Sequence, residues 1–230
     1  MSILASVEHA QVLPGRFRLP VRMTILALAP GHVALVSPIP LTPEVEALVA
    51  RHGEVDFLIA PSLFHHLYLG AAAARYPKAR VLAPAGLRKK RPELRIDATL
   101  EEGLPAALAA HVDVVKVAGA PIADEHVFFH GATRTLVVTD LVFHVERPRG
   151  LVTGLILRLV GCHGRLGHSR SWSLFIKDKA AAAASLQAIL AWPFEHLVVA
   201  HGTPVEGDAH ARLSQALAPR ISKHLKMLPA

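Results

Sequence analysis

The order of the apolar runs is what most constrains the fold of this chain, because they alternate with helical segments in some places and follow one another in others. Two short apolar runs within 23–41 flank Pro30-Gly31, which is typical of a β-hairpin. Strands are expected at 55–61, 79–84 and 196–202, each after a helical segment, whereas three strands in 112–140 follow one another directly. This order predicts an α/β (α+β) sandwich with mixed sheets instead of one parallel sheet.

The helical segments carry recognisable ends. Thr42 can cap a helix that opens with Pro43 and Glu44 and ends at Gly53. Further helices are expected over 67–76, stopped before Pro77, and over 180–192 and 211–228, and the last of them is amphipathic. Between the central strands and the 180–192 helix, residues 143–179 contain scattered Gly, Arg and His, and we interpret them as an insertion or lid within a single domain spanning 1–230.

Composition indicates a soluble protein with a large core. The chain is 52% hydrophobic with a mean hydropathy of +0.36, yet every apolar stretch is broken well short of a membrane span, so no membrane partner is expected. Glu8 and His9 interrupt the region where a signal peptide needs an unbroken apolar centre. The single cysteine, Cys162, cannot form an internal disulfide, so we expect a cytoplasmic location.

The net charge of +7 raises the question of a nucleic-acid partner. One basic cluster lies at 88–95, and five arginines are spread over 147–170 with Trp172 as the nearest aromatic residue. We favour a solvated basic face and keep nucleic-acid binding as a less favoured alternative. The oligomeric state does not follow from the sequence.

Residues whose side chains can bind a metal ion stand at the ends of three apolar strands: His65 and His66, Asp140, and His201. Strand ends in an α/β sheet can converge on a ligand, and imidazole nitrogens with a carboxylate oxygen are what Zn, Fe or Mn takes from a protein. The sequence thus predicts a divalent metal site, with Zn favoured over Fe or Mn. A metal-free site, in which these side chains make structural hydrogen bonds, is the alternative.

The HH pair, the segment RTLVVTDL and the segment LVVAHGTPV, in this order, resemble the metallo-β-lactamase superfamily. The segments SPIPLT, YPKARVLAP and HGATRTLVVTDL resemble an uncharacterised, divergent subgroup of it. The resemblance implies a four-layer αββα sandwich of two mixed β-sheets flanked by helices. It also implies a strand-end HxHxDH motif, a later bridging Asp and a final His.

This chain departs from that motif. With the last His of HxHxDH on His66, the first two histidines fall on Pro61 and Leu63, and His65 replaces the Asp. The family's next His falls near Ala120. One whole metal position is lost, while the resemblance assigns His65, His66, Asp140 and His201 to the other.

The resemblance therefore implies a hydrolase-like protein with a degenerate, single-metal site, acting on an unknown small molecule. The alternative is a non-catalytic protein of the same fold that binds a ligand or a partner. No catalytic residue is assigned. His130 and His144 are considered as an added ligand or proton shuttle, and Thr139 as a residue that orients Asp140.

Overall fold

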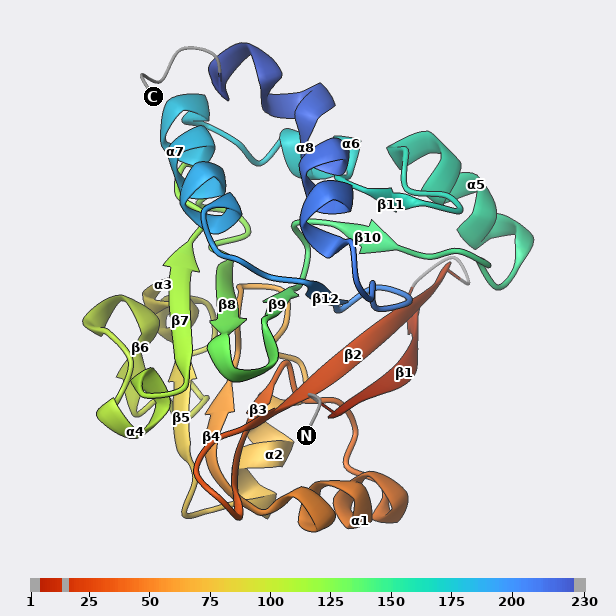
Figure 1. Cartoon of the computed structure of the whole chain (residues 1–230). Helices are drawn as coiled ribbons and strands as arrows, with labels where there is room; N and C mark the ends of the chain where they lie inside the picture. The colour runs from red at the N-terminus through yellow and green to blue at the C-terminus, as the bar shows by residue number, and fades with distance from the viewer. Residues whose placement is uncertain (1–4, 14–16, 226–230) are drawn as a thin grey trace.

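The computed structural model describes residues 5–13 and 17–225, which form two main β-sheets with helices on their outer sides (Figure 1). The last three residues of the helix expected over 211–228 lie outside the described residues; its described part belongs to α8 (Ala209–Leu225). None of the helices in the described part of the chain has both the length and the apolar character required to span a bilayer.

The first sheet has its strands in sequence order. They are β1 (Ala5–Leu13), β2 (Phe17–Ala27), β3 (His32–Val36), β4 (Glu54–Ile59), β5 (Arg80–Ala83) and β6 (Ala98–Thr99). The predicted hairpin is confirmed, because β2 and β3 pair antiparallel across the Pro30-Gly31 turn, where Gly31 has a φ of 80°. From β3 to β6 the pairs are parallel, and three helices connect these strands: α1 (Pro43–His52), α2 (Leu69–Arg75) and α3 (Ala85–Lys90).

Strand β1 was not expected from the sequence. It pairs antiparallel with β2 along its whole length, and its residues alternate between half-buried and exposed over most of that length. Polar residues such as Glu8 and Gln11 hide the apolar pattern of a strand that is covered on one side only. The resulting β1–β2 hairpin extends the first sheet to the edge where the strand ends gather.

The second sheet has the order β12-β9-β8-β7. Its strands are β7 (Val112–Lys116), β8 (His126–His130), β9 (Thr135–Val138) and β12 (His196–Val199). The first three form the predicted antiparallel meander, and β12 returns parallel to β9 after α7 (Lys179–Leu190). Both sheets are thus mixed, as predicted.

Three separate apolar cores define the layers. One lies between the sheets and joins Phe57 and Ile59 of the first sheet to Phe128 and Val137 of the second. A second core packs α1, α2 and α3 on the outer face of the first sheet, and a third packs α7 and α8 on the second. This is the αββα sandwich that the sequence led us to expect.

Residues 143–179 are folded within the described chain. They contain β10 (Phe143–His144), α5 (Leu151–Val160), β11 (Leu166–Gly167) and α6 (Arg170–Ser173). Strand β10 pairs with β11, and a small cluster of Val145, Leu157 and Cys162 holds α5 against them. The short segments elsewhere are η2 (Leu100–Glu102), α4 (Ala106–Ala109) and η3 (Gly131–Thr133).

Candidate metal centre

Three side chains from different strand ends meet at one edge of the sandwich: His65, Asp140 and His201. His65 follows β4 of the first sheet, while Asp140 and His201 follow the parallel neighbours β9 and β12 of the second. Their possible ligand atoms all lie within 4.8 Å of one another. His65 and His201 are 8% and 3% exposed, so the group is buried near the join of the two sheets.

The distances within this group match those around a metal ion. The Nε2 atoms of His65 and His201 are 3.2 Å apart, His201 Nε2 lies 3.2 Å from Asp140 Oδ1, and His65 Nε2 lies 3.4 Å from Asp140 Oδ2. A tetrahedral ion with bonds of about 2.0–2.1 Å holds its ligand atoms about 3.3 Å from one another. Asp140 Oδ2 is also buried without a hydrogen-bond partner among the described residues. The group could therefore hold a metal ion.

Hydrogen bonds on the far side of each ring fix how the two imidazoles face the centre. His201 Nδ1–H donates to the carbonyl oxygen of Pro20 on β2, at 2.7 Å. His65 Nδ1 lies 2.8 Å from the hydroxyl oxygen of Ser37, which follows β3. In neutral His201 this bond leaves a lone pair on Nε2, pointed toward the other two side chains. Phe143 stacks on the His201 ring, with centroids 4.6 Å apart.

The backbone around the two histidines is equally constrained. Ser62 Oγ accepts hydrogen bonds from the backbone N–H groups of Phe64 and His65, which closes the turn after β4. Gly202 follows His201 with a φ of 112°, and a Cβ there would lie 2.0 Å from the carbonyl oxygen of His144. Only glycine fits at that position. The ligand geometry is thus built into the fold.

Charge also favours a cation at this centre. Burial by itself raises the pKa of Asp140, but the adjacent imidazoles of His65 and His201, in their protonated form, outweigh it, so the pKa lies below its ordinary value. The carboxylate is therefore ionised at neutral pH. A carboxylate with a buried oxygen beside two imidazoles needs a compensating positive charge, which a metal ion or a proton can supply.

Two residues near the centre were missed by sequence reasoning. Ser37 orients His65, as described above, and has an unusual positive φ of 56°. Glu125 is fully buried just before β8; its Oε1 accepts a 2.7 Å bond from the Thr139 N–H, and burial, with Asp140 nearby, raises its pKa to about 7. An acidic residue two positions before the apolar run 127–129 of β8 was the available signal for Glu125. It fixes the backbone that presents Asp140.

His66 lies outside the three-residue group, although it is the sequence neighbour of His65. Its ring is 4% exposed, and burial, followed by the charges of Lys90 and Arg91, lowers its pKa to about 4. Its Nδ1 atom is buried without a hydrogen-bond partner among the described residues. The structure therefore separates the two histidines that the sequence placed in one site.

The other residues considered from the sequence have structural partners. His130 Nε2–H donates to the carbonyl of Ala27, and His144 Nδ1–H donates to the carbonyl of Thr203. The N–H of Thr139, bonded to Glu125, is the part of that residue that supports Asp140, since its hydroxyl has no hydrogen-bond partner among the described residues. None of the three belongs to the ligand group.

The segments where the family's other ligands would fall do lie side by side. The carbonyl of Pro61 accepts from the His126 N–H at 2.8 Å, and the N–H of Leu63 donates to the carbonyl of Ala123 at 2.9 Å. Ala120 itself is buried. The chain has no ligand side chains at Pro61, Leu63 and Ala120.

A cavity of about 260 Å³ opens onto the group. Ser37, His65, Asp140 and His201 form its polar end, and most of the remaining wall is apolar, contributed by Leu13, Leu19, Val21, Pro38, Phe64 and Leu67. Tyr68 and Gln11 also line it and are joined by a 2.7 Å hydrogen bond, which ties β1 to the loop after His66. No lysine or arginine is among the described residues of this wall.

Comparison with known proteins identifies the fold. The family model "Domain of unknown function (DUF4336)" matches residues 6–86, and no curated protein matches the chain. A metallo-β-lactamase from Pontibacter korlensis shares 15% identity over 98% of this chain and 100% of its own, with a TM-score of 0.61. The metallo-β-lactamase FIM-1 from Pseudomonas aeruginosa, in its mono-zinc form, shares 10% over 98% and 93%, with a TM-score of 0.61.

A third similar structure is the metal-soaked Flv1 flavodiiron core from Synechocystis sp. PCC6803, at 12% identity. The alignment covers 95% of this chain and 59% of that one, with a TM-score of 0.65. These likenesses establish the metallo-β-lactamase fold for this chain, as the sequence resemblance implied.

Proposed function

We propose that this protein is a metal-dependent hydrolase with one divalent ion, held by His65, Asp140 and His201, with Zn favoured over Fe or Mn. The observation that carries the proposal is the spacing of 3.2–3.4 Å among these three side chains, together with a buried carboxylate oxygen that has no other partner. Three protein ligands leave a fourth coordination position open, which is the arrangement of catalytic rather than structural zinc sites.

Bound there, the ion would polarise a carbonyl oxygen and lower the pKa of a water molecule toward neutrality. The chain itself supplies orientation. Pro20 and Ser37 hold the two imidazoles, and Glu125 holds the backbone of Thr139 so that the Asp140 carboxylate faces them. Because one metal position is missing, the site lacks the second ion that clamps attacking and leaving oxygens in two-metal hydrolases.

The walls of the cavity indicate the substrate class. A phosphoester brings negative charges that are usually met by lysine or arginine, and the described wall contains neither. A cavity of about 260 Å³ with a mostly apolar wall suits a small neutral molecule with an apolar body. We therefore propose an ester or a lactone as substrate, with its carbonyl at the polar end.

The second candidate is a non-catalytic protein of the same fold that binds a ligand in this cavity. The absence of ligand side chains at Pro61, Leu63 and Ala120 favours it. In that case, a proton shared among Asp140 and the two imidazoles would compensate the buried charge, and no metal would be retained.

Elemental analysis of protein prepared without a histidine tag separates the candidates. We expect about one equivalent of metal in the wild type, loss of that metal in His65→Gln and His201→Gln, and retention in His66→Gln. His66 is a matched control because it is the adjacent residue, equally buried, and outside the ligand group. If the wild type stays metal-free after reconstitution with Zn, Fe and Mn, the hydrolase proposal fails. If the wild type does carry the metal, a screen of esters, lactones and phosphoesters is the next experiment.

A further inference from the structure

Helix α5 exposes an unusual amount of apolar surface. Leu151, Val152, Leu155 and Leu159 are 94%, 44%, 57% and 64% exposed, and they recur at helical spacing on one side of the helix. Leu174, shortly after α6, is 80% exposed. A soluble protein commonly has single exposed leucines, but a row of them on one helix marks a surface that binds something.

The opposite side of α5 is apolar as well. Thr153, Gly154 and Leu157 are buried, and Leu157 packs with Val145 and Cys162. A helix that is apolar all round is normally enclosed on every side. Here only one side is covered by the described chain, so the other side needs an external environment that accepts aliphatic side chains.

The helix is firmly attached, so the exposed face has a fixed position. Arg18 on β2 donates its backbone N–H to the Thr153 hydroxyl at 3.0 Å. At the other end, Gly161 caps the helix with a φ of 81°, and the Cys162 N–H bonds to the carbonyl of Leu157. The exposed row therefore belongs to the folded domain.

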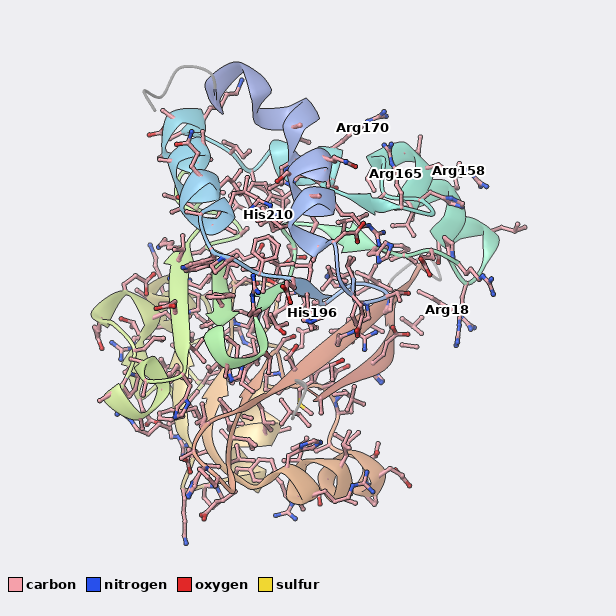
Figure 2. The ribbon with its side chains drawn as sticks, viewed as in Figure 1. Arg18, Arg158, Arg165, Arg170, His196 and His210 are labelled. Atoms are coloured by element: carbon pink, nitrogen blue, oxygen red, sulfur yellow. The ribbon has the colours of Figure 1, made fainter. Side chains whose placement is uncertain are left out.

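Positive charge surrounds this apolar row. Residues 143–177 contain five arginines, one lysine and a single acidic residue, Glu146. Figure 2 shows the side chains of Arg158, Arg165 and Arg170 around α5 and β11, with Arg18 below the helix. Arg170 donates to the carbonyl of Leu159, and Arg165 donates to that of Gly161, so their guanidinium groups lie beside the end of the leucine row.

We propose that the α5 face binds the surface of an anionic lipid bilayer. Aliphatic side chains inserted among the acyl chains and arginines at headgroup level are the two features that hold an interfacial helix on a membrane. The ten residues of α5 extend about 15 Å, enough to lie in the interface and too short to cross it. The proposal departs from the expectation of no membrane partner, which rested on the lack of a membrane-spanning segment and did not consider a helix lying on the surface.

Two other occupants fit less well. A second copy of the chain, joined through α5, would bring the same arginines of both copies together, and like charges at an interface are costly. RNA would match the arginines, but it would leave the leucine row without apolar contacts. An anionic bilayer satisfies the charge and the apolar surface together.

The test is co-sedimentation of the full chain with phosphatidylcholine vesicles, with and without phosphatidylglycerol. We expect binding to the anionic vesicles only, weakened by added salt. The double variant Leu155→Glu/Leu159→Glu should lower the partition constant by about tenfold or more, because it removes two inserted side chains and adds negative charge. Both positions are exposed, so circular dichroism should show an unchanged fold.

Ile122→Glu is the matched control, since Ile122 is 43% exposed and lies outside 143–177. It should leave binding unchanged. Failure of the wild type to bind anionic vesicles would overturn the proposal. A wild-type dimer, detected by sedimentation velocity and broken by the double variant, would assign the face to a second copy instead, and binding to single-stranded RNA without binding to vesicles would assign it to nucleic acid.

Discussion

The metal centre and the outer face of α5 are opposite departures from ordinary packing. At the centre, two imidazoles and a carboxylate oxygen are buried where apolar groups would be expected; on α5, leucines are exposed where polar residues would be expected. In both places the chain tolerates an arrangement that is unfavourable for the isolated domain. Such arrangements are retained where something binds, and we propose a cation in the first case and a lipid surface in the second.

Removing the carboxylate should have the largest effect. Asp140→Asn keeps the size of the side chain but takes away the only negative charge among the three ligands. We expect metal affinity to fall by more than about a hundredfold, with loss of any esterase activity. Metal titration by calorimetry measures this. If the variant binds metal as tightly as the wild type, Asp140 is no ligand.

Gly202→Ala tests how strictly the backbone holds His201. A Cβ at this position would lie 2.0 Å from the carbonyl oxygen of His144, and the φ of 112° is unfavourable for alanine. The loop after β12 must move, which should cost about 3 kcal/mol of unfolding free energy and weaken metal binding. Chemical denaturation measures the cost. Gly207→Ala, at a φ of 87° but with open space around its Cβ, is the control for strain alone.

The two sides of α5 should respond differently to the same substitution. Leu157→Ala removes a side chain that is 1% exposed and should cost about 2–4 kcal/mol. Leu155→Ala, two residues away on the other side of the helix and 57% exposed, should change the unfolding free energy by less than about 0.5 kcal/mol. Equal losses would mean that the outer face of α5 is covered by the chain in solution, contrary to its use as a docking surface.

Ser37→Ala is expected to have a smaller effect at the centre. The hydroxyl lies 2.8 Å from His65 Nδ1 and fixes the orientation of that ring. Residues that orient a ligand in this way typically account for about 10–100-fold in metal affinity. Ser62→Ala, which alters the turn without touching the ring, provides the comparison. An unchanged affinity in Ser37→Ala would show that packing alone orients His65.

The smallest expected effect concerns acid stability away from both regions. Burial lowers the pKa of His130, whose ring bonds across the sheets to the carbonyl of Ala27. As the pH falls, the unfolded chain takes up the proton before the folded protein does. The contribution of neutral His130 to the free energy of unfolding is therefore complete above the ordinary pKa of 6.5 and declines as the pH falls below it. His130→Gln should flatten this decline, as followed by thermal melting between pH 7.5 and about 5.

Sequence reasoning went furthest where patterns are local. The hairpin around Pro30-Gly31, the helix capped by Thr42 and the meander before Asp140 all follow from turn residues and periodicity within a few positions. Strand β1 was missed, because a half-covered edge strand with Glu8 and Gln11 has no clear apolar pattern. The expected hairpin began only at residue 23, so the first part of β2, which supplies the Pro20 carbonyl that orients His201, was missed as well.

The sequence by itself determined which chemical groups stand at the strand ends and that Pro61, Leu63 and Ala120 cannot be ligands through their side chains. Only the tertiary structure decided that His65 and not His66 faces Asp140, because the turn closed by Ser62 sets the direction in which each ring points. It also brought Ser37 and Glu125 to the centre from distant positions and left one apolar side of α5 uncovered by the described residues. Local patterns fix residue types and elements; side-chain direction and coverage depend on how separate elements pack.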